Sequence, residues 1–167
     1  SATRGNHGQS IAIAAVAAGR SATIVVPHGN SPDKNEAMRA WGAELVEHGH
    51  DFQAAREYAQ QLADERELEL VPSYHRDLVC GVATYALELF EGVAAVGAHL
   101  DTVYVPVGLG SGISGMIVAR DLLGLDTEIV GVVAERANAT LLSFTAGHAV
   151  STDSADTFID GVACRVP

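Results

Sequence analysis

The sequence predicts a parallel α/β fold, with helices on both faces of its sheets. Segments with helical spacing of apolar residues alternate with short runs rich in Val, Ile and Tyr. Two of these runs, residues 101–108 and 127–134, are almost wholly apolar, which is typical of strands buried on both faces of a parallel sheet. The chain has 167 residues, 48% of them hydrophobic, which is enough for one ordinary domain or two small ones.

The expected elements follow in order along the chain. Ser31 is a candidate N-cap, and Pro32 stands at the first helical position after it. The change of strand type near residues 73–77 predicts a boundary between a small α/β domain, residues 1–73, and part of a larger one, residues 74–167. Helices are expected at 9–18, 31–43, 51–66, 78–93 and 113–124, and strands at 21–27, 44–49, 68–73, 101–108 and 127–134.

Charge and cysteine content exclude some classes of protein. A formal net charge of -11 argues against binding to nucleic acid, which needs a basic face. Cys80 and Cys164 fit no metal-ligand spacing, so we expect two buried free thiols in a reducing cytoplasm. No apolar run approaches the ~20 residues of a membrane span, and no membrane partner is expected. Since the chain also lacks an initiator Met, we expect its natural start to lie upstream.

A polar cluster, TRGNHGQS at residues 3–10, precedes an apolar run that is expected to be helical. The cluster therefore lies where a loop enters a helix N-terminus. Backbone N–H groups point outward there, and the helix dipole favours a bound anion.

A second glycine-rich stretch, residues 105–115, leads from an expected strand into an expected helix, an arrangement that can hold phosphate. It fits three interpretations. Gly110, Gly112 and Gly115 match G-x-G-x-x-G, with Glu135 as the acidic ribose partner of a dinucleotide. The stretch equally suits a phosphate monoester such as pyridoxal 5′-phosphate (PLP), or a turn without ligand. The first polar cluster favours PLP, because a PLP enzyme needs a separate site for the substrate carboxylate.

Several stretches of the sequence together resemble one known family. Residues 3–12 resemble the asparagine loop of the fold type II PLP enzymes, the group of threonine dehydratase, serine dehydratase and serine racemase. In the same order, residues 22–49, 103–115, 128–135 and 155–163 resemble the small-domain segment, the phosphate loop, the strand after it and a late T-x-A-D-G-I-A segment. The similarity covers nearly the whole chain and is greatest to the threonine dehydratases.

The resemblance implies two three-layer parallel-sheet α/β domains, the second of which binds PLP. It implies β-elimination of L-threonine to 2-oxobutanoate and ammonia. The alternatives are a dehydratase of serine or another β-hydroxy amino acid, and a Rossmann-type nucleotide-binding domain. A homodimer or homotetramer in the cytoplasm is expected.

The resemblance implies roles for individual residues of this chain at the positions that match the family's motifs. The resemblance implies that Asn6 hydrogen-bonds the ring hydroxyl oxygen of PLP. Arg4 stands where racemases have a serine, and because Arg cannot shuttle a proton near neutral pH, no racemase activity is expected. The residues implied for the substrate carboxylate are Thr3, Arg4, Gly5, Asn6 and His7, and those implied for the PLP phosphate are Gly108, Leu109, Gly110, Ser111 and Gly112.

The family's Schiff-base lysine lies upstream of the asparagine loop, so we expect no catalytic lysine in this chain. Lys34, the only lysine, is expected to be a solvated helix charge. His7 is either an acid/base catalyst or a residue that orients its loop. No metal site is expected, because Leu141 stands where some relatives pair an Asp with the Glu at position 135, and because the polar stretch at residues 47–51 lacks further ligands.

Overall fold

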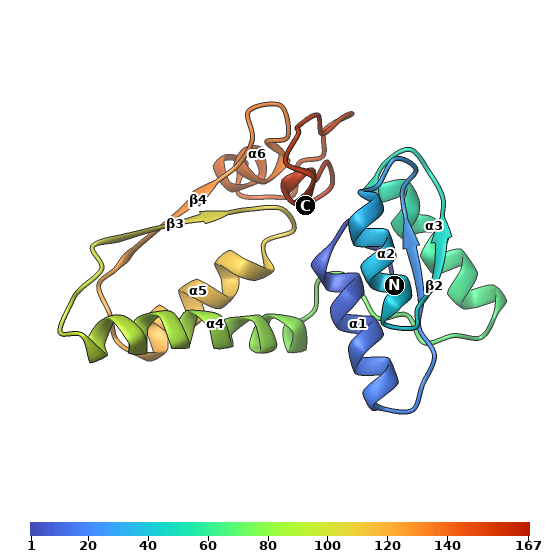
Figure 1. Cartoon of the computed structure of the whole chain (residues 1–167). Helices are drawn as coiled ribbons and strands as arrows, with labels where there is room; N and C mark the ends of the chain where they lie inside the picture. Colours follow the sequence, from blue (N-terminus) through green and yellow to red (C-terminus); the bar gives the residue numbers. More distant parts are fainter. The chain divides into compact units, whose positions relative to one another are not determined.

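The computed structural model describes residues 1–167, and the chain divides into two compact units, Ser1–Ser73 and Tyr74–Pro167 (Figure 1). Each unit contains a two-stranded parallel sheet with helices packed on it. The predicted α/β class with parallel sheets is therefore confirmed. The assignment of the two units to a small domain and to part of a larger cofactor-binding domain stays a prediction.

The first unit contains three helices and a short parallel sheet. β1 pairs with β2 along its whole length, with Thr23 opposite Glu44. Ala2 forms a parallel bridge to Val25, so β1 has a hydrogen-bonded neighbour on either side. The elements are α1 (Asn6–Ala17), β1 (Thr23–Val26), α2 (Pro32–Ala40), β2 (Glu44–Glu47) and α3 (Phe52–Glu65).

Alternation along β1 builds the core of this unit. Successive side chains of a strand point to opposite faces of its sheet, and here both faces are covered. Ile24 and Val26 pack with α1 and α2, whereas Val25 packs with α3. The three layers predicted for the fold are thus present in this unit. One cluster consists of Ala12, Ile24, Val26, Met38 and Ala43, and the other of Ala2, Val25, Ala55, Ala59 and Leu62.

The second unit has its helices α4 and α5 on one face of its sheet. Val105 of β3 is buried with Ala86 and Phe90 of α4 and with Met116 and Ala119 of α5. β3 and β4 are parallel, with Thr102 opposite Glu128. The elements are α4 (Arg76–Ala95), β3 (Thr102–Pro106), α5 (Ser111–Leu122), β4 (Glu128–Val132), α6 (Ala139–Ala146) and the short 3-10 helix η1 (Asp160–Val162).

Three strand predictions need correction. The sequence predicts that β3 and β4 are buried on both faces, but Tyr104 is 70% exposed and Val132 is 45% exposed. The reason is that within this chain the helices α4 and α5 cover only one face of the sheet. The strand predicted at residues 68–73 is wrong, since no ladder forms there. Its apolar pattern has another cause, because Leu70 packs against the cluster around α3.

Helix α4 corrects two further expectations. Cys164 is buried as expected, but Cys80, on α4, is exposed. The helix has 20 residues and a mean hydropathy of 1.5, so by length and composition alone it could cross a membrane, contrary to the sequence-based expectation. A single helix of this kind is a weak indication, and Ala86 and Phe90 bury one side of it against α5 and the sheet.

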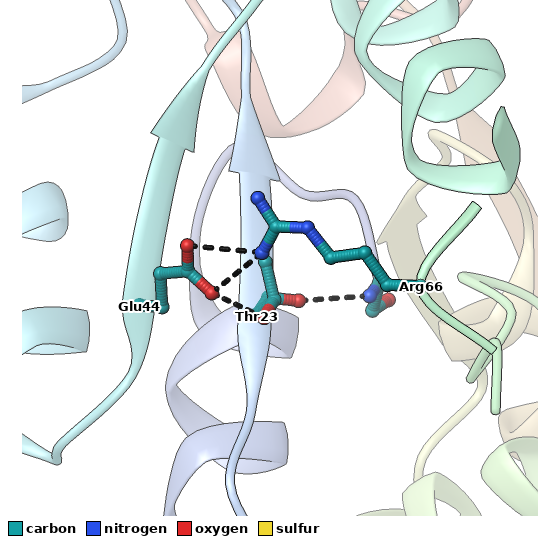
Figure 2. A network of polar contacts seen from close by, with 4 residues as sticks. Thr23, Glu44 and Arg66 are labelled. Carbon is teal, nitrogen blue, oxygen red and sulfur yellow. Dashed lines mark hydrogen bonds and ion pairs between the residues drawn. The ribbon is translucent and has the colours of Figure 1, made fainter. Parts of the chain in front are cut away.

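A polar network ties the two strands of the first unit to the end of α3 (Figure 2). The hydroxyl of Thr23 donates to Oε2 of Glu44 over 2.8 Å. A guanidinium nitrogen of Arg66 lies 3.1 Å from each oxygen of the same carboxylate. The hydrogen bonds from Thr23 and Arg66 lower the pKa of Glu44 below its ordinary value of 4.5.

We expect Glu44→Gln to lower the free energy of unfolding by about 0.5 kcal/mol at neutral pH, because exposed ion pairs contribute little. The folded-state pKa of Glu44 lies below 4.5, so this stabilisation is fully present above that pH and is lost as the pH falls through the folded-state pKa. Urea denaturation of both proteins across this range measures the difference. Glu36→Gln, at an exposed position on α2, is the control, and an equal loss there would contradict the assignment.

Candidate functional site

The turn before α1 leaves several backbone donors without acceptors. The N–H of Gly5 donates to Oγ1 of Thr3 over 3.0 Å. The N–H groups of Arg4, Asn6 and His7 donate to no protein atom. Unpaired N–H groups at a helix N-terminus, together with the helix dipole, favour a bound anion. The residues predicted to bind the substrate carboxylate therefore lie together at the N-terminus of α1, where such donors are available.

Two side chains of this turn differ in their surroundings. Helix α1 begins at Asn6, three residues earlier than the sequence predicts, and the exposed amide of Asn6 makes no hydrogen bond. Nε2 of His7 lies 2.9 Å from the hydroxyl of Ser1. Burial lowers the pKa of His7, so its ring is neutral at pH 7. The contact with Ser1 favours a role in orienting the turn.

Lys34 lies against the same turn. A β-carbon at position 5 would lie 3.6 Å from Nζ of Lys34 and 3.5 Å from its Cδ. The side chain is half-buried, although the sequence predicts a solvated helix charge. A positive charge therefore stands beside the unpaired N–H groups.

A second set of unpaired donors lies between β3 and α5. Gly110 has φ 99°, in the left-handed region that favours glycine. The N–H groups of residues 108–113 donate to no protein atom, although Ser114 starts the helical ladder by donating to Gly110. The five residues predicted for a phosphate therefore form one continuous turn of outward donors, with Leu109 and Ser111 included.

Hydroxyl groups from two other segments hold this turn in place, and a third segment lies close to it. Oγ1 of Thr140 donates to the carbonyl of Gly108 over 3.2 Å. The hydroxyl of Tyr85, whose pKa is raised by burial, donates to the carbonyl of Gly112 over 3.1 Å. A β-carbon at position 108 would lie 2.7 Å from the carbonyl oxygen of Gly161. The turn is therefore held through its carbonyls, and its N–H groups stay available.

Sequence reasoning missed these supporting residues. Tyr85 and Gly112 lie 27 residues apart, and Thr140 and Gly108 lie 32 apart. No local spacing marks such pairs. Only the place of Gly161 within the resembling late segment, residues 155–163, was a signal.

The residues singled out for a dinucleotide site or a metal site have other surroundings in the structure. Gly115 is buried where a β-carbon would lie 3.1 Å from Cα of Ala83, so this glycine serves the close packing of α5 on α4. Glu135 is exposed. His48 stacks on the ring of Tyr58 with centroids 3.8 Å apart. The structure holds no group of three or more His, Cys, Asp or Glu side chains that could bind a metal ion.

Comparison with known proteins decides the family. Residues 1–167 match the family described as pyridoxal-phosphate dependent enzyme. The chain belongs to this PLP-dependent family. The resemblance to fold type II PLP enzymes is thereby confirmed, and the dinucleotide interpretation of the second turn is not retained.

Relatives are similar to the chain over most of its length. The biosynthetic L-threonine dehydratase IlvA of Escherichia coli is 33% identical over 165 residues, 98% of this chain and 31% of that protein. The L-threo-3-hydroxyaspartate ammonia-lyase of Saccharomyces cerevisiae is 34% identical, over 94% of this chain and 47% of that protein. The solved processed form of threonine deaminase isoform 2 from Solanum lycopersicum has a TM-score of 0.86 at 30% identity, covering 99% of this chain and 48% of that one. The chain spans less than half the length of these relatives.

The second turn of this PLP-dependent chain fits a phosphate group. Its consecutive N–H groups are unpaired, it lies at the start of a 12-residue helix, and a β-carbon at Gly110 would meet no protein atom within 4 Å. A phosphate needs several donors in such a concave arrangement. The roles of individual residues toward PLP and substrate stay predictions.

We expect Gly108→Ala to weaken PLP binding about tenfold or more. The new β-carbon would lie 2.7 Å from the carbonyl of Gly161, so the turn must shift and lose aligned donors. Titration of the full-length protein with PLP measures the affinity. Gly92→Ala on α4, where a β-carbon meets nothing within 4 Å, is the matched control. Unchanged affinity in Gly108→Ala would contradict the assigned phosphate position.

Proposed function

We propose that the protein is a PLP-dependent threonine dehydratase, which converts L-threonine to 2-oxobutanoate and ammonia. The main observation in support of this proposal is that two turns, one before α1 and one before α5, have unpaired N–H groups. A PLP-dependent enzyme acting on an amino acid must hold two anions, the cofactor phosphate and the substrate carboxylate. Similarity to threonine dehydratases over 98% of the chain supports the choice of reaction.

The turn before α5 is proposed to bind the phosphate of PLP. The donors are the N–H groups of Gly108, Leu109, Gly110, Ser111 and Gly112, and the hydroxyl of Ser111 adds a further one. The positive end of the α5 dipole adds to the attraction. These groups position the cofactor through its phosphate.

The turn before α1 is proposed to bind the substrate carboxylate. Its unpaired N–H groups belong to Arg4, Asn6 and His7. The hydroxyl of Thr3 accepts from the N–H of Gly5 and fixes the shape of the turn. The exposed amide of Asn6 is assigned to the ring hydroxyl oxygen of PLP, where it sets the angle of the ring.

PLP, when bound, draws electrons from the α-carbon of the amino acid and so permits loss of the α-proton and of the β-hydroxyl. The residues of this chain bind and orient both partners. His7 is neutral and bonded to Ser1, which suits orientation of the turn. The lysine that carries PLP in this family is expected outside this sequence. Serine or another β-hydroxy amino acid is the second candidate substrate, since the same two anion sites would serve it.

The assembly and the location of the protein are part of the same proposal. By resemblance to its family, the protein is proposed to be a homodimer or homotetramer in the cytoplasm, with a small-molecule substrate and no membrane or nucleic-acid partner. A net charge of -11 supports the last point. Light scattering of the full-length protein measures the assembly, and a monomer would contradict it.

We expect the full-length, PLP-loaded protein to release 2-oxobutanoate from L-threonine, and Asn6→Ala to lower kcat/KM about tenfold or more. The reason is the loss of a hydrogen bond to the cofactor. Coupled detection of the 2-oxo acid measures both. Ser10→Ala, one turn further along α1 and also exposed, is the control.

Two results would contradict the proposal. If a folded, PLP-loaded protein released no oxo acid from L-threonine or L-serine, the reaction would be another one of the same family. If Ser10→Ala and Asn6→Ala lost activity equally, the assignment of Asn6 would be wrong.

A further inference from the structure

Arg4 is a half-buried cation without a protein partner. Its side chain makes no hydrogen bond and no ion pair, and its Nε is buried without an acceptor. A guanidinium is always charged, and burying one of its N–H groups unpaired costs free energy. Buried polar groups of folded proteins are normally paired, and no residue of this chain supplies an acceptor for this one.

The other arginines show how unusual this is. Four of them pair with carboxylates, and three others without a bonded partner, Arg20, Arg56 and Arg76, are exposed to water. The chain offers 21 acidic residues, yet none reaches Arg4. The pairs are Arg39–Glu47, Arg66–Glu44, Arg120–Asp121 and Arg136–Asp156.

Lys34 approaches the same turn from α2. Its Nζ would be 3.6 Å from a β-carbon on Gly5, the residue that follows Arg4. The unpaired N–H groups of Asn6 and His7 and the dipole of α1 already provide for one carboxylate. These groups account for one carboxylate without the guanidinium of Arg4.

We propose that Arg4 is a specificity-determining residue that binds a second carboxylate, carried by the side chain of the substrate. This inference rests on the proposed dehydratase function and names a substrate class within it. The enzyme accepts β-hydroxy amino acids with an acidic side chain in addition to L-threonine. The planar guanidinium binds the side-chain carboxylate with two N–H donors, which a lysine cannot do. L-threonine, with a methyl group at that place, leaves Arg4 unpaired.

The first test compares two substrates in the full-length, PLP-loaded protein. L-threo-3-hydroxyaspartate is L-threonine with a carboxylate in place of the methyl group. We expect both to be turned over, and Arg4→Gln to lower the kcat/KM of the dicarboxylate relative to that of L-threonine about tenfold or more, mainly through the KM of the dicarboxylate. Arg4→Lys recovers only part of the loss. Arg56→Gln removes the same charge from an exposed site in the same unit and changes neither.

The second test needs no turnover. Calorimetric titration of the same protein with succinate and with propionate compares a dicarboxylate with a monocarboxylate, neither of which has an amino group. We expect tighter binding of succinate in the wild type and in Arg56→Gln, and loss of this preference in Arg4→Gln.

The outcomes separate the two proposals. Turnover of L-threonine without a preference for succinate overturns the role of Arg4 and leaves the dehydratase standing. A succinate preference that depends on Arg4 in a protein inactive on both substrates supports the second carboxylate site and overturns the dehydratase. Equal binding of succinate and propionate by the wild type overturns the role of Arg4, whether or not the Arg4 variants fold.

Discussion

An α-helix cannot satisfy the N–H groups of its own first turn, and the candidate site depends on this constraint. In α1 the N–H groups of Asn6 and His7 have no protein acceptor, and in α5 those of residues 111–113 have none. The chain keeps them unpaired instead of capping them with side chains. No side-chain cap bond is made at Gly5 or at Gly110. Where hydroxyl groups do contact the second turn, they bind its carbonyls and leave the donors free.

The same local connection occurs in both units. A residue or strand in parallel pairing comes first, then a glycine turn, then a helix. In the first unit, Ala2 is bridged to β1 and α1 begins at Asn6. In the second unit, β3 pairs with β4 and α5 begins at Ser111. Because parallel strands point the same way, such a connection places each helix start beyond the carboxyl end of its strand, where α/β proteins bind ligands.

The sequence alone predicts the strands and helices around the two turns, because their signals are local. Pro32 marks the start of α2, and a polar-to-apolar change marks α1. Burial of a strand depends on which segments distant in sequence pack against it. The strand of Tyr104 has an apolar pattern and was predicted to be buried on both faces, but helices cover only one face of its sheet. Lys34 was expected in solvent for a similar reason, since its own helix is polar and its contact with Gly5 comes from a distant segment.

The hydroxyl groups of Thr140 and Tyr85 have a consequence for the affinity of the second turn for a phosphate. Each donates to one carbonyl of the second turn, which restrains the peptide planes that follow Gly108 and Gly112. The conformational entropy of the turn is therefore lost when the chain folds, before any phosphate arrives. Binding of a phosphate then requires less ordering of the turn, which favours affinity.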